Sequence, residues 1–535
     1  MNAPCQICQK AYEVTAVELS FLEQISPVFG GNKYLLPPPR FCPACRQQRR
    51  LAYRNEKTLY KRSCDLCHKD MISTYRPEST FTVYCRDCWW SDQWDGLSFG
   101  QDFGFTRSFY EQYAEVLAKM PRLGVTNAQD QNSDYTNYGY RNKDCYLMFT
   151  SDQNQGCHYG TYVWNSVDCF DNFFVLYSEL CYQCVDCVQC YGCSFCQECE
   201  NCSDCFGCFD MKGCRNCFGS SGLRNKEYVF FNEQLDKETY EARVQEAKQN
   251  WPALMERLKS VGQGTPRRNL FIVSSENAHG DHLKNCKNVA QCFDCQDFEE
   301  GMYCGNVVAK SDHCFDMDGG GFTYWCYEVL STGATANRCV GVEHTWNNGN
   351  DLLHCAFCMG SNDLLGCAGL HRKQYCILNK QYSKEEYEAL AARIVEHMKS
   401  TGEWGLFFPP ALTPFAYNET AAQVYYPLTR EKALALGYTW DDAVVSEHEA
   451  EQQRVPTKAK PFNITKLEEE FYRKRGLPTP TEHPFVRLKK LFAKRNPRQL
   501  WQRSCSKCGT SMQSSYAPDR PEIVYCEKCY LESVY

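Results

Sequence analysis

Residues 181–217 read CYQCVDCVQCYGCSFCQECENCSDCFGCFDMKGCRNC, and their spacing decides the fold of the middle of the chain. Cysteine recurs at every third position from Cys181 to Cys208. A longer ladder places a cysteine at every twelfth position: Cys145, Cys157, Cys169, Cys181, Cys193, Cys205 and Cys217. Turn formers such as Asp144 and Gly156 precede most of these cysteines, and a fixed period with turns at one phase is typical of a solenoid. Because so short a period cannot hold a helical hairpin, the pattern predicts a β-solenoid whose coils stack about 4.8 Å apart.

The interior of so narrow a coil has room only for small side chains. A thiol is small and readily buried, so we expect the cysteines at every third position to point inward. The Tyr and Phe side chains between them would then face outward and form an aromatic surface.

A second cysteine array, within residues 286–376, shows the same twelvefold steps interrupted by other spacings. Its end matches the end of the first array at an offset of 147, with GLRNKEY at residues 222–228 and GLHRKQY at residues 369–375. The polar segments that follow also align, and Ser383 with Glu386 has the pattern of a helix capping box. We therefore expect two solenoids, each closed by a helix that covers its open edge.

Three pairs of CxxC motifs predict three zinc ribbons. The two motifs of a pair are separated by 33 residues in the first ribbon and by 17 in the other two. Four thiolates close the tetrahedral shell of a structural Zn²⁺ and leave no open position for chemistry. The expected ligands are Cys5, Cys8, Cys42, Cys45, Cys64, Cys67, Cys85, Cys88, Cys505, Cys508, Cys526 and Cys529. About three structural zinc ions per chain follow from this count.

The second and third ribbons are copies of one domain. A shift of 441 positions superimposes their CxxC motifs without a gap. The same shift pairs Arg54 with Arg495, and residues 83–84 with residues 524–525. One domain has therefore been duplicated to two distant places in the chain.

The other 26 of the 38 cysteines lie in the repeats, and three roles stay open for them. They could form a packed core of free thiols, because cysteine behaves as a small hydrophobic residue. They could bind soft metal ions such as zinc or copper(I). They could also form a ladder of disulfides, which a reducing compartment disfavours.

The net charge of −7 hides two basic segments. Residues 40–62 hold eight Lys or Arg against one Glu, and residues 463–504 hold 11 against four. Basic segments beside a zinc ribbon favour contact with a polyanion, although a solvated helix face is the alternative. The expected phosphate contacts are Arg46, Arg49, Arg50, Arg54, Lys489, Lys490, Arg498 and Arg503. Trp89, Trp90 and Trp501 are expected to stack on bases.

Two stretches resemble known proteins. CQICQKAYEVTAVELSFLEQ (5–24) followed by PPPRFCPACRQQRR (37–50) resembles the probable-zinc-ribbon family, with its CxxC, aromatic and acidic stretch, and CPxCRxxRR. RNEKTLYKRSCDLC (54–67), VYCRDCWW (83–90) and VYCEKCY (524–530) resemble a wider group of uncharacterised bacterial proteins that join zinc ribbons to cysteine-rich repeats. The resemblance covers most of the chain and implies this domain layout, but it implies no reaction.

The sequence favours a binding function over catalysis. It contains no GxSxG, Walker lysine loop, HExxH or GxGxxG after a strand, and DMDGGG at residues 316–321 is interpreted as a Gly-rich bend. No apolar run reaches about 18 residues and the first ten residues hold a CxxC, so we expect no membrane span, no signal peptide and a cytoplasmic location. We predict a non-enzymatic zinc protein that contacts structured RNA or the ribosome. The alternatives are a metal-storage or thiol redox-buffering protein, and a protein–protein scaffold that uses the aromatic solenoid surface.

The predicted fold class is mainly β and multidomain, with three small zinc ribbons flanking two β-solenoids of about 12-residue coils. The expected parts are ribbon 1 (1–58), ribbon 2 (59–92), an aromatic linker with a short helix (93–126), solenoid 1 (127–232), a capping helix (233–262), solenoid 2 (268–382), a capping helix (383–400), a mixed Pro and aromatic segment (401–445), a linker (446–462), a basic helical segment (463–497) and ribbon 3 (498–535).

Overall fold

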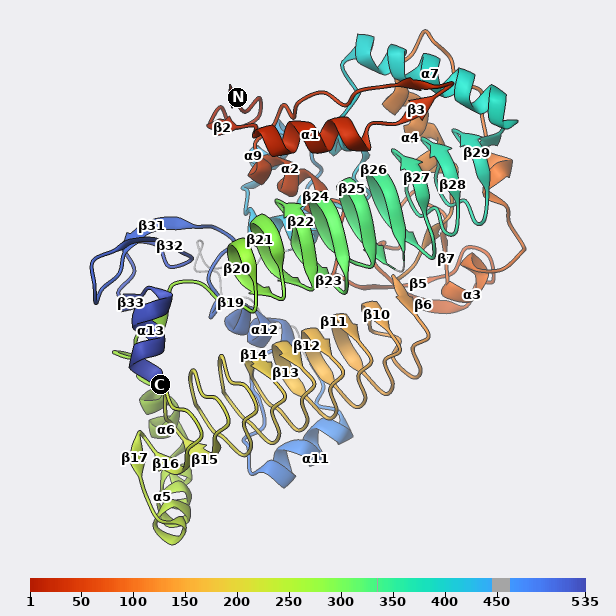
Figure 1. The fold of residues 1–535 in the computed structure, drawn as a ribbon. Helices are drawn as coiled ribbons and strands as arrows, with labels where there is room; N and C mark the ends of the chain where they lie inside the picture. Colours follow the sequence, from red (N-terminus) through yellow and green to blue (C-terminus); the bar gives the residue numbers. More distant parts are fainter. Residues whose placement is uncertain (334, 445–461) are drawn as a thin grey trace. The chain divides into compact units, whose positions relative to one another are not determined.

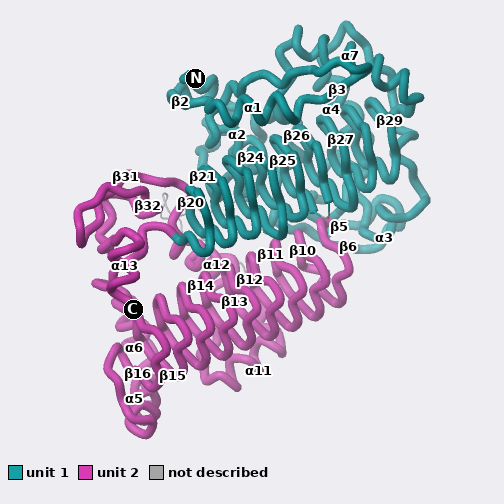
Figure 2. The backbone as a smooth tube through the Cα atoms, in the orientation of Figure 1, with its two compact units in different colours: residues 1–124, 271–448 teal, residues 125–270, 449–535 magenta. Residues whose placement is uncertain are grey.

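Segments that are distant in the sequence come together in two units (Figure 2). The computed structural model describes residues 1–333, 335–444 and 462–535. Unit 1 comprises Met1–Gly124 and Phe271–His448, and unit 2 comprises Val125–Leu270 and Glu449–Tyr535. Solenoid 2 therefore shares a unit with ribbons 1 and 2, whereas solenoid 1 shares a unit with ribbon 3. The predicted linker 446–462 lies outside the described residues except for Phe462.

Each solenoid coil is built from three-residue sides. In a side, one residue points into the coil, the next pairs with the neighbouring coils, and the third has a positive φ. In one coil of solenoid 1 these third residues are Asp144, Leu147, Thr150 and Gln153, with φ of 54°, 51°, 49° and 57°. A left-handed residue turns the chain at each corner, and Asp, Asn and Gly adopt this conformation at the lowest cost. This explains why turn formers precede the ladder cysteines.

Solenoid 1 is a stack of parallel coils with a constant register (Figure 1). Tyr146 pairs with His158, and His158 pairs with Phe170 one coil further on. Its strands are β9 (Asn127–Ala128), β10 (Asn137–Tyr140), β11 (Tyr146–Asp152), β12 (His158–Trp164), β13 (Phe170–Leu176), β14 (Val185–Val188), β15 (Arg215–Phe218) and β16 (Glu227–Phe230). The inward cysteines from Cys145 to Cys217 lie in one buried cluster, as their period predicts.

Solenoid 2 has the same construction with coils of unequal length. Cys314 lies opposite Cys326, which is the regular step, but Cys326 lies opposite Cys339, which is one position more. The next step is also one position longer, with Val340 opposite Leu353, and two consecutive residues with positive φ, Asn347 and Asn348, mark the corner that takes up its extra residue. Its strands are β19 (Ile272–Val273), β20 (Glu276–Lys284), β21 (Lys287–Gln296), β22 (Phe298–Met302), β23 (Gly305–Val308), β24 (Ser311–Gly321), β25 (Thr323–Gly333), β26 (Ala336–Trp346), β27 (Asn350–Leu353), β28 (Asn362–Leu365) and β29 (Gln374–Ile377). The interrupted spacing of the second array therefore has two causes: single-residue insertions, and other apolar residues such as Val289 and Val307 at inward positions.

Both solenoids end in the same way. The last parallel strand turns back into a short antiparallel one, β17 (Glu233–Gln234) beside β16 and β30 (Lys380–Gln381) beside β29. Helices follow directly: α5 (Lys237–Gln249) and α6 (Trp251–Leu258) after solenoid 1, and α7 (Lys384–Thr401) after solenoid 2. The capping box of Ser383 and Glu386 is present at the start of α7. The predicted fold class, with two solenoids each closed by a helix, is confirmed.

Helices cover two rows of outward side chains in solenoid 1. One row, which includes Phe170 and Phe218, packs against α5, α6 and α11 (Lys466–Arg475). A second row, which includes Phe173, packs against α12 (Pro484–Phe492). The predicted aromatic surface is therefore mostly covered, although Tyr177 and Tyr191 remain 58 % and 48 % exposed.

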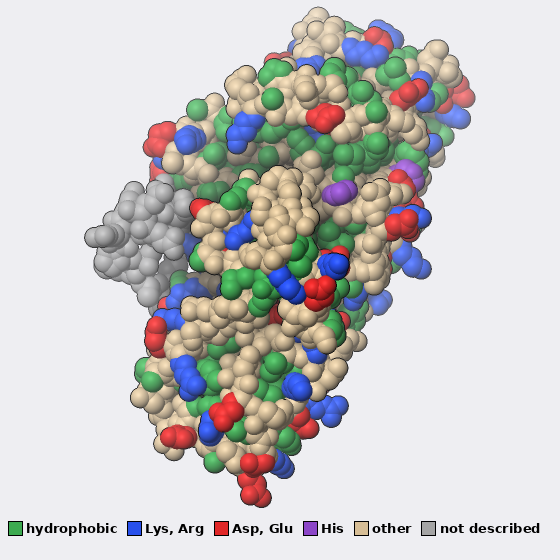
Figure 3. All heavy atoms as spheres, turned by 60° about the vertical axis from the view of Figure 1, so that its left-hand side comes forward, with side chains coloured by type: hydrophobic (Ala, Val, Ile, Leu, Met, Phe, Trp, Pro, Cys, Tyr) green, Lys and Arg blue, Asp and Glu red, His purple; other side chains and the backbone are tan. Residues whose placement is uncertain are grey.

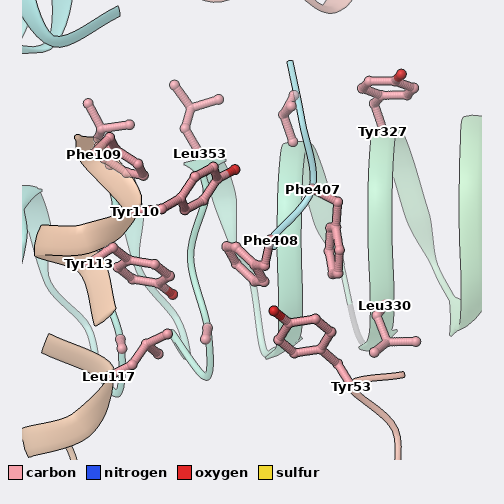
Figure 4. Close-up of a cluster of buried hydrophobic side chains, with 14 of the residues drawn as sticks. Tyr53, Phe109, Tyr110, Tyr113, Leu117, Tyr327, Leu330, Leu353, Phe407 and Phe408 are labelled. Atoms are coloured by element: carbon pink, nitrogen blue, oxygen red, sulfur yellow. The ribbon is translucent and has the colours of Figure 1, made fainter. Parts of the chain in front are cut away.

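The core of unit 1 lies between solenoid 2 and the helices of its other segments. Figure 4 shows Tyr113 of α4 (Phe109–Lys119) facing Phe408, and Tyr53 beside Phe407, over the solenoid strands. The ring centroids of both pairs are 5.4 Å apart. The remaining short elements of this unit are α1 (Ala16–Ile25), β3 (Val28–Phe29), β4 (Asn32–Lys33), η1 (Gly96–Phe99), η2 (Pro410–Leu412), η3 (Tyr417–Glu419), α8 (Ala421–Tyr425) and α9 (Arg430–Ala435). Among the described residues, no helix combines the length and apolarity needed to cross a membrane.

Candidate metal centres

Each ribbon begins with the same CxxC turn between two short antiparallel strands. The strand pairs are β1 (Asn2–Pro4) with β2 (Ala11–Glu13), β5 (Tyr60–Ser63) with β6 (Asp70–Ser73), and β31 (Trp501–Ser504) with β32 (Ser511–Ser514). In all three turns the amide of the first cysteine donates to a carbonyl beyond the second cysteine at 2.9 Å: Cys5 to Lys10, Cys64 to Lys69 and Cys505 to Thr510. The residue after the second cysteine has a positive φ in each: Gln9, His68 and Gly509. One local conformation therefore presents both thiols of the first motif.

The second CxxC motif of each ribbon lies at the N-terminus of a helix. The helices are α2 (Pro43–Leu51), α3 (Arg86–Trp89) and α13 (Glu527–Val534), and their N-caps are Cys42, Cys85 and Cys526. The partial positive charge at a helix N-terminus stabilises a thiolate. In ribbon 2 the amide of Cys85 also donates to Sγ of Cys64 at 3.2 Å, and Cys526 repeats this contact to Cys505 at 3.3 Å.

The sulfur atoms of the two motifs converge in every ribbon. Within each group of four cysteines all Sγ atoms lie within 4.8 Å of one another. Across the two motifs the Sγ–Sγ distances are 3.7 Å for Cys8–Cys42, 3.8 Å for Cys67–Cys85 and 3.9 Å for Cys508–Cys526. A tetrahedral ion with Zn–S bonds of about 2.3 Å requires sulfur atoms about 3.8 Å apart. The predicted ligands thus form three groups that could each hold a metal ion.

Thiols in so close a group cannot all ionise without a cation. In ribbon 1 a hydrogen bond from the Cys45 thiol lowers the pKa of Cys42 to about 5, and the same contact raises the pKa of Cys45. One thiolate therefore forms readily, whereas further thiolates beside it are disfavoured until a positive ion neutralises them. This is the electrostatic arrangement that a divalent metal ion completes.

Ribbons 2 and 3 each pair with the strand that directly precedes a solenoid. In ribbon 2, β7 (Val83–Tyr84) pairs in parallel with β8 (Arg122–Leu123), directly before solenoid 1. In ribbon 3, β33 (Val524–Tyr525) pairs in the same way with β18 (Arg267–Arg268), directly before solenoid 2. The next amides, of Gly124 and Asn269, donate to the carbonyls of Tyr84 and Tyr525, both at 3.0 Å. The duplicated domain has therefore kept one structural contact in both places.

The arginines of ribbon 1 contact solenoid 2 instead of solvent. Arg46 forms ion pairs with Glu18 at 2.9 Å and with Asp316 at 2.8 Å. Arg50 contacts Asp316, Asp318 and Glu328 at 3.1, 2.9 and 2.8 Å. All of these side chains are at most 5 % exposed. The DMDGGG stretch is thus part of strand β24 and supplies carboxylates to α2.

Burial and ion pairing act in opposite directions on the charges of this cluster. Burial by itself lowers the pKa of Arg50, but the carboxylates of Asp318, Glu328 and Asp316 raise it above its ordinary value. Four carboxyl groups face two guanidinium groups, and burial raises the pKa of Glu18 to about 7. Removing one partner from such a cluster costs about 3–5 kcal/mol, because a buried charge is left uncompensated.

Most of the other predicted phosphate contacts also have structural partners. Arg49 donates to the carbonyls of Phe407 and Phe408 at 2.6 and 3.1 Å, and Arg54 pairs with Glu56 at 2.6 Å. Both are at most 6 % exposed, so in this structure Arg46, Arg49, Arg50 and Arg54 are not available to phosphates.

In unit 2, Arg503 donates to the carbonyls of Ala517 and Glu522 at 2.9 and 2.7 Å. Lys490 is exposed and pairs with Glu482 at 2.5 Å, while Lys489 and Arg498 are half-buried. Of the tryptophans expected to stack on bases, Trp89 is fully buried, Trp501 is half-buried and Trp90 is 40 % exposed.

The solenoid thiols form no comparable metal group among the described residues. Each points into the coil, and its Sγ donates to backbone carbonyl oxygens, as Cys181 does to Glu179 and Cys190 at 3.5 and 3.6 Å. None of the 38 cysteines, all of which belong to the described residues, forms a disulfide. The structure thus has the packed core of free thiols, and it contains neither a disulfide ladder nor a fourth thiol cluster within the part described.

The comparisons with known proteins give no functional assignment. No protein-family model matches the chain, and no curated protein matches it. One solved chain, described as a "putative acetyltransferase from Desulfovibrio desulfuricans G20", is 9 % identical. The match covers 51 % of this chain and 81 % of that one, with a TM-score of 0.10, which is too low to carry an argument.

Proposed function

We propose that this protein is a zinc-stabilised binding scaffold. Three Zn²⁺ ions in the Cys₄ groups stabilise the three ribbons, and the solenoids present surfaces to a partner. The observation that carries the proposal is the repeated contact of ribbons 2 and 3 with the strands that lead into the solenoids. Four thiolates fill the shell of a structural zinc and leave no position for a substrate. A reducing compartment such as the cytoplasm would keep the solenoid thiols free.

The partner surface in this proposal is the uncovered side of solenoid 1. Two rows of its side chains, which include Tyr177 and Tyr191, stay exposed while helices cover the other aromatic rows. Solenoids commonly bind partners along such extended rows. Exposed tyrosines in a polar surrounding are typical contact residues of protein interfaces.

The structural role of zinc is tested by hydrogen exchange with and without chelator. Removal of zinc should abolish the exchange protection of the Gly124 and Asn269 amides. The carbonyl oxygens that accept their hydrogen bonds belong to ribbons 2 and 3, and these ribbons should unfold without zinc. The inner amides of solenoid 1, such as Cys193, should keep their protection. Full protection at Gly124 and Asn269 after complete zinc removal would contradict the proposal.

The scaffold role is tested by cross-linking in cell extract with the wild type and with Tyr177→Glu plus Tyr191→Glu. The double variant should lose a specific cross-linked protein, because a buried contact cannot accommodate the two charges. The matched control is Gln189→Glu on an exposed residue of the same face. A partner that both variants retain equally would show that this face is not the contact.

Contact with structured RNA or the ribosome is the second candidate, and one observation favours it. Arg473 and Lys474 of α11 and Lys490 of α12 are exposed on one unit. Figure 3 shows Lys and Arg interspersed with Asp and Glu over the face drawn, not gathered in one basic patch. Gel retardation at low salt tests this candidate: reversing all three to Glu should weaken binding and reduce the salt slope by roughly three. Zinc-loaded protein that retards no RNA would exclude it.

A further inference from the structure

A cavity of about 630 Å³ opens where the first coils of solenoid 1 meet the start of α11. This volume lies in the range of small-ligand sites. Its lining includes Asp134, Tyr135, Asp144, Tyr146, His158 and Asp168. All of them belong to unit 2, and the proposed zinc sites and scaffold surface do not use them.

The lining of the cavity concentrates negative charge. Asp134, Asp144 and Asp168 contribute three carboxyl groups, and no Lys or Arg is among the described residues that line the cavity. None of the three forms an ion pair with a described residue; Asp144 accepts a hydrogen bond from Nδ2 of Asn132 at 2.8 Å. Burial raises the pKa of Asp168 and Glu179 raises it further, while Lys474, outside the lining, offsets this rise only in part. A bound positive charge would remove the remaining repulsion.

Aromatic rings form the wall beside these carboxylates. Tyr135 and Tyr146 meet edge to face with centroids 5.1 Å apart, and Tyr146 contacts the ring of His158 at 5.9 Å. The faces of such rings attract cations within about 6 Å. These edge-to-face rings therefore offer a cation both apolar contact and electrostatic attraction.

The cavity also contains a buried polar group, the ring of His158, one nitrogen of which lacks a hydrogen-bond partner in the described part of the chain. Its side chain is 5 % exposed, and Nδ1 has no hydrogen-bond partner among the described residues. Burial lowers the pKa of His158 to about 4, so the ring is neutral at pH 7 and can accept a hydrogen bond. A buried ring nitrogen without a partner is costly unless a bound group satisfies it.

We infer that this cavity binds an organic cation with N–H donors, a primary ammonium or guanidinium group. The carboxylates of Asp144 and Asp168 would balance its charge, the Tyr146 ring would lie against it, and Nδ1 of His158 would accept one of its hydrogens. The N-terminus of α11, which could otherwise favour an anion, is closed by the capping box of Thr465 and Glu468. The cation is carried either by a small amine or by a Lys or Arg side chain of a polypeptide.

Titration calorimetry with the full-length, zinc-loaded protein tests the site. The probes are agmatine, acetyl-Gly-Arg-Gly-amide, and acetyl-Gly-citrulline-Gly-amide, which has the shape of the second peptide without its charge. Agmatine should bind, and Asp168→Asn should weaken that binding about tenfold or more, because a charge-assisted hydrogen bond is lost. His158→Phe keeps an aromatic ring beside Phe170 and should weaken binding, because it removes both ring nitrogens, including the Nδ1 acceptor.

The matched control is Asp204→Asn. Asp204 occupies the same corner row as Asp168, three coils on, with φ of 51° against 48°, and Asn tolerates this conformation as well as Asp. It should leave agmatine binding unchanged while removing the same charge from the same solenoid. Equal loss in Asp204→Asn and Asp168→Asn would overturn the assignment, since the effect would then come from overall charge.

The three probes separate the remaining outcomes. Binding of agmatine alone supports a small-amine site, and binding of the arginine peptide as well supports a basic side chain of a partner. Equal binding of the arginine and citrulline peptides would overturn the inference, because charge would not matter. No heat from either charged probe at millimolar concentration would overturn it too, whatever the outcome for the zinc sites.

Discussion

The cysteines of the ribbons and those of the solenoids are one residue type in two different surroundings. In the ribbons, a tight turn and a helix N-terminus bring four Sγ atoms within 4.8 Å of one another. In the solenoids, thiols at a higher density each donate to backbone carbonyl oxygens, as Cys193 does to Tyr191 and Cys202. Thiols that converge from two local motifs could therefore hold a metal ion, whereas a dense ladder of thiols forms a hydrophobic core.

The largest expected effect is the loss of a ribbon. Cys64→Ser or Cys505→Ser should release one zinc ion and unfold that ribbon, because structural zinc contributes about 10–16 kcal/mol of folding free energy in small zinc domains. Native mass spectrometry counts the ions, and limited proteolysis reports the unfolding. Retention of all zinc and of protease resistance in both variants would place these thiols in the same class as the solenoid ones.

The basic side chains of the two basic segments divide into a buried set and an exposed set. Arg50→Glu should destabilise unit 1 by about 3–5 kcal/mol, since it places a fifth negative group in the buried cluster with Asp316, Asp318 and Glu328. Urea denaturation measures this change. Lys490→Glu is the control: its pair with Glu482 is exposed, so the free energy of unfolding should change by less than about 1 kcal/mol. Equal changes in the free energy of unfolding for Arg50→Glu and Lys490→Glu would contradict the distinction between buried and exposed basic side chains.

The loss of a solenoid thiol should lower the free energy of unfolding much less than the loss of a ribbon thiol. Cys193→Ala should lower the free energy of unfolding by about 1–2 kcal/mol, because it removes a small buried group and leaves a small cavity. The zinc content should stay at the wild-type value. A decrease of one metal ion per chain in this variant would show that the solenoid thiols bind metal, as the ribbon thiols are expected to do.

The smallest perturbation is chemical labelling without any substitution. After mild zinc removal, iodoacetamide should first modify Cys8 and Cys508, which are exposed, whereas the buried solenoid thiols should react only when the protein unfolds. Peptide mass spectrometry over time gives the order. Early modification of Cys181 or Cys193 would show that the solenoid opens more easily than its hydrogen-bonded coils indicate.

Local features of the fold could be predicted from the sequence because they depend on neighbouring residues. The three-residue period of Cys181–Cys208 specifies inward thiols, and the turn formers at Asp144 and Gly156 occupy corners that require a left-handed backbone. The CxxC pairs specify the metal groups because each pair needs only its own turn or helix start. The unequal coils of solenoid 2 could not be read in this way, since an insertion at Asn347–Asn348 shifts the period without changing composition.

The roles of the charged and aromatic side chains depend on contacts between segments that are distant in the sequence. Arg50 and Asp316 are separated by 266 residues, and each alone has the pattern of a surface group. They pair because α2 packs against strand β24, and no local sequence period predicts this packing. The basic stretch 40–62 therefore suggested contact with a polyanion, whereas the structure has buried ion pairs. In the same way Phe170 faces outward as its phase predicts, but Phe471 of α11, from a much later part of the chain, covers it. The period of the repeat specifies which side chains point into each coil, because that direction depends on the local backbone. The exposure of the outward side chains depends on segments that fold back from far along the chain.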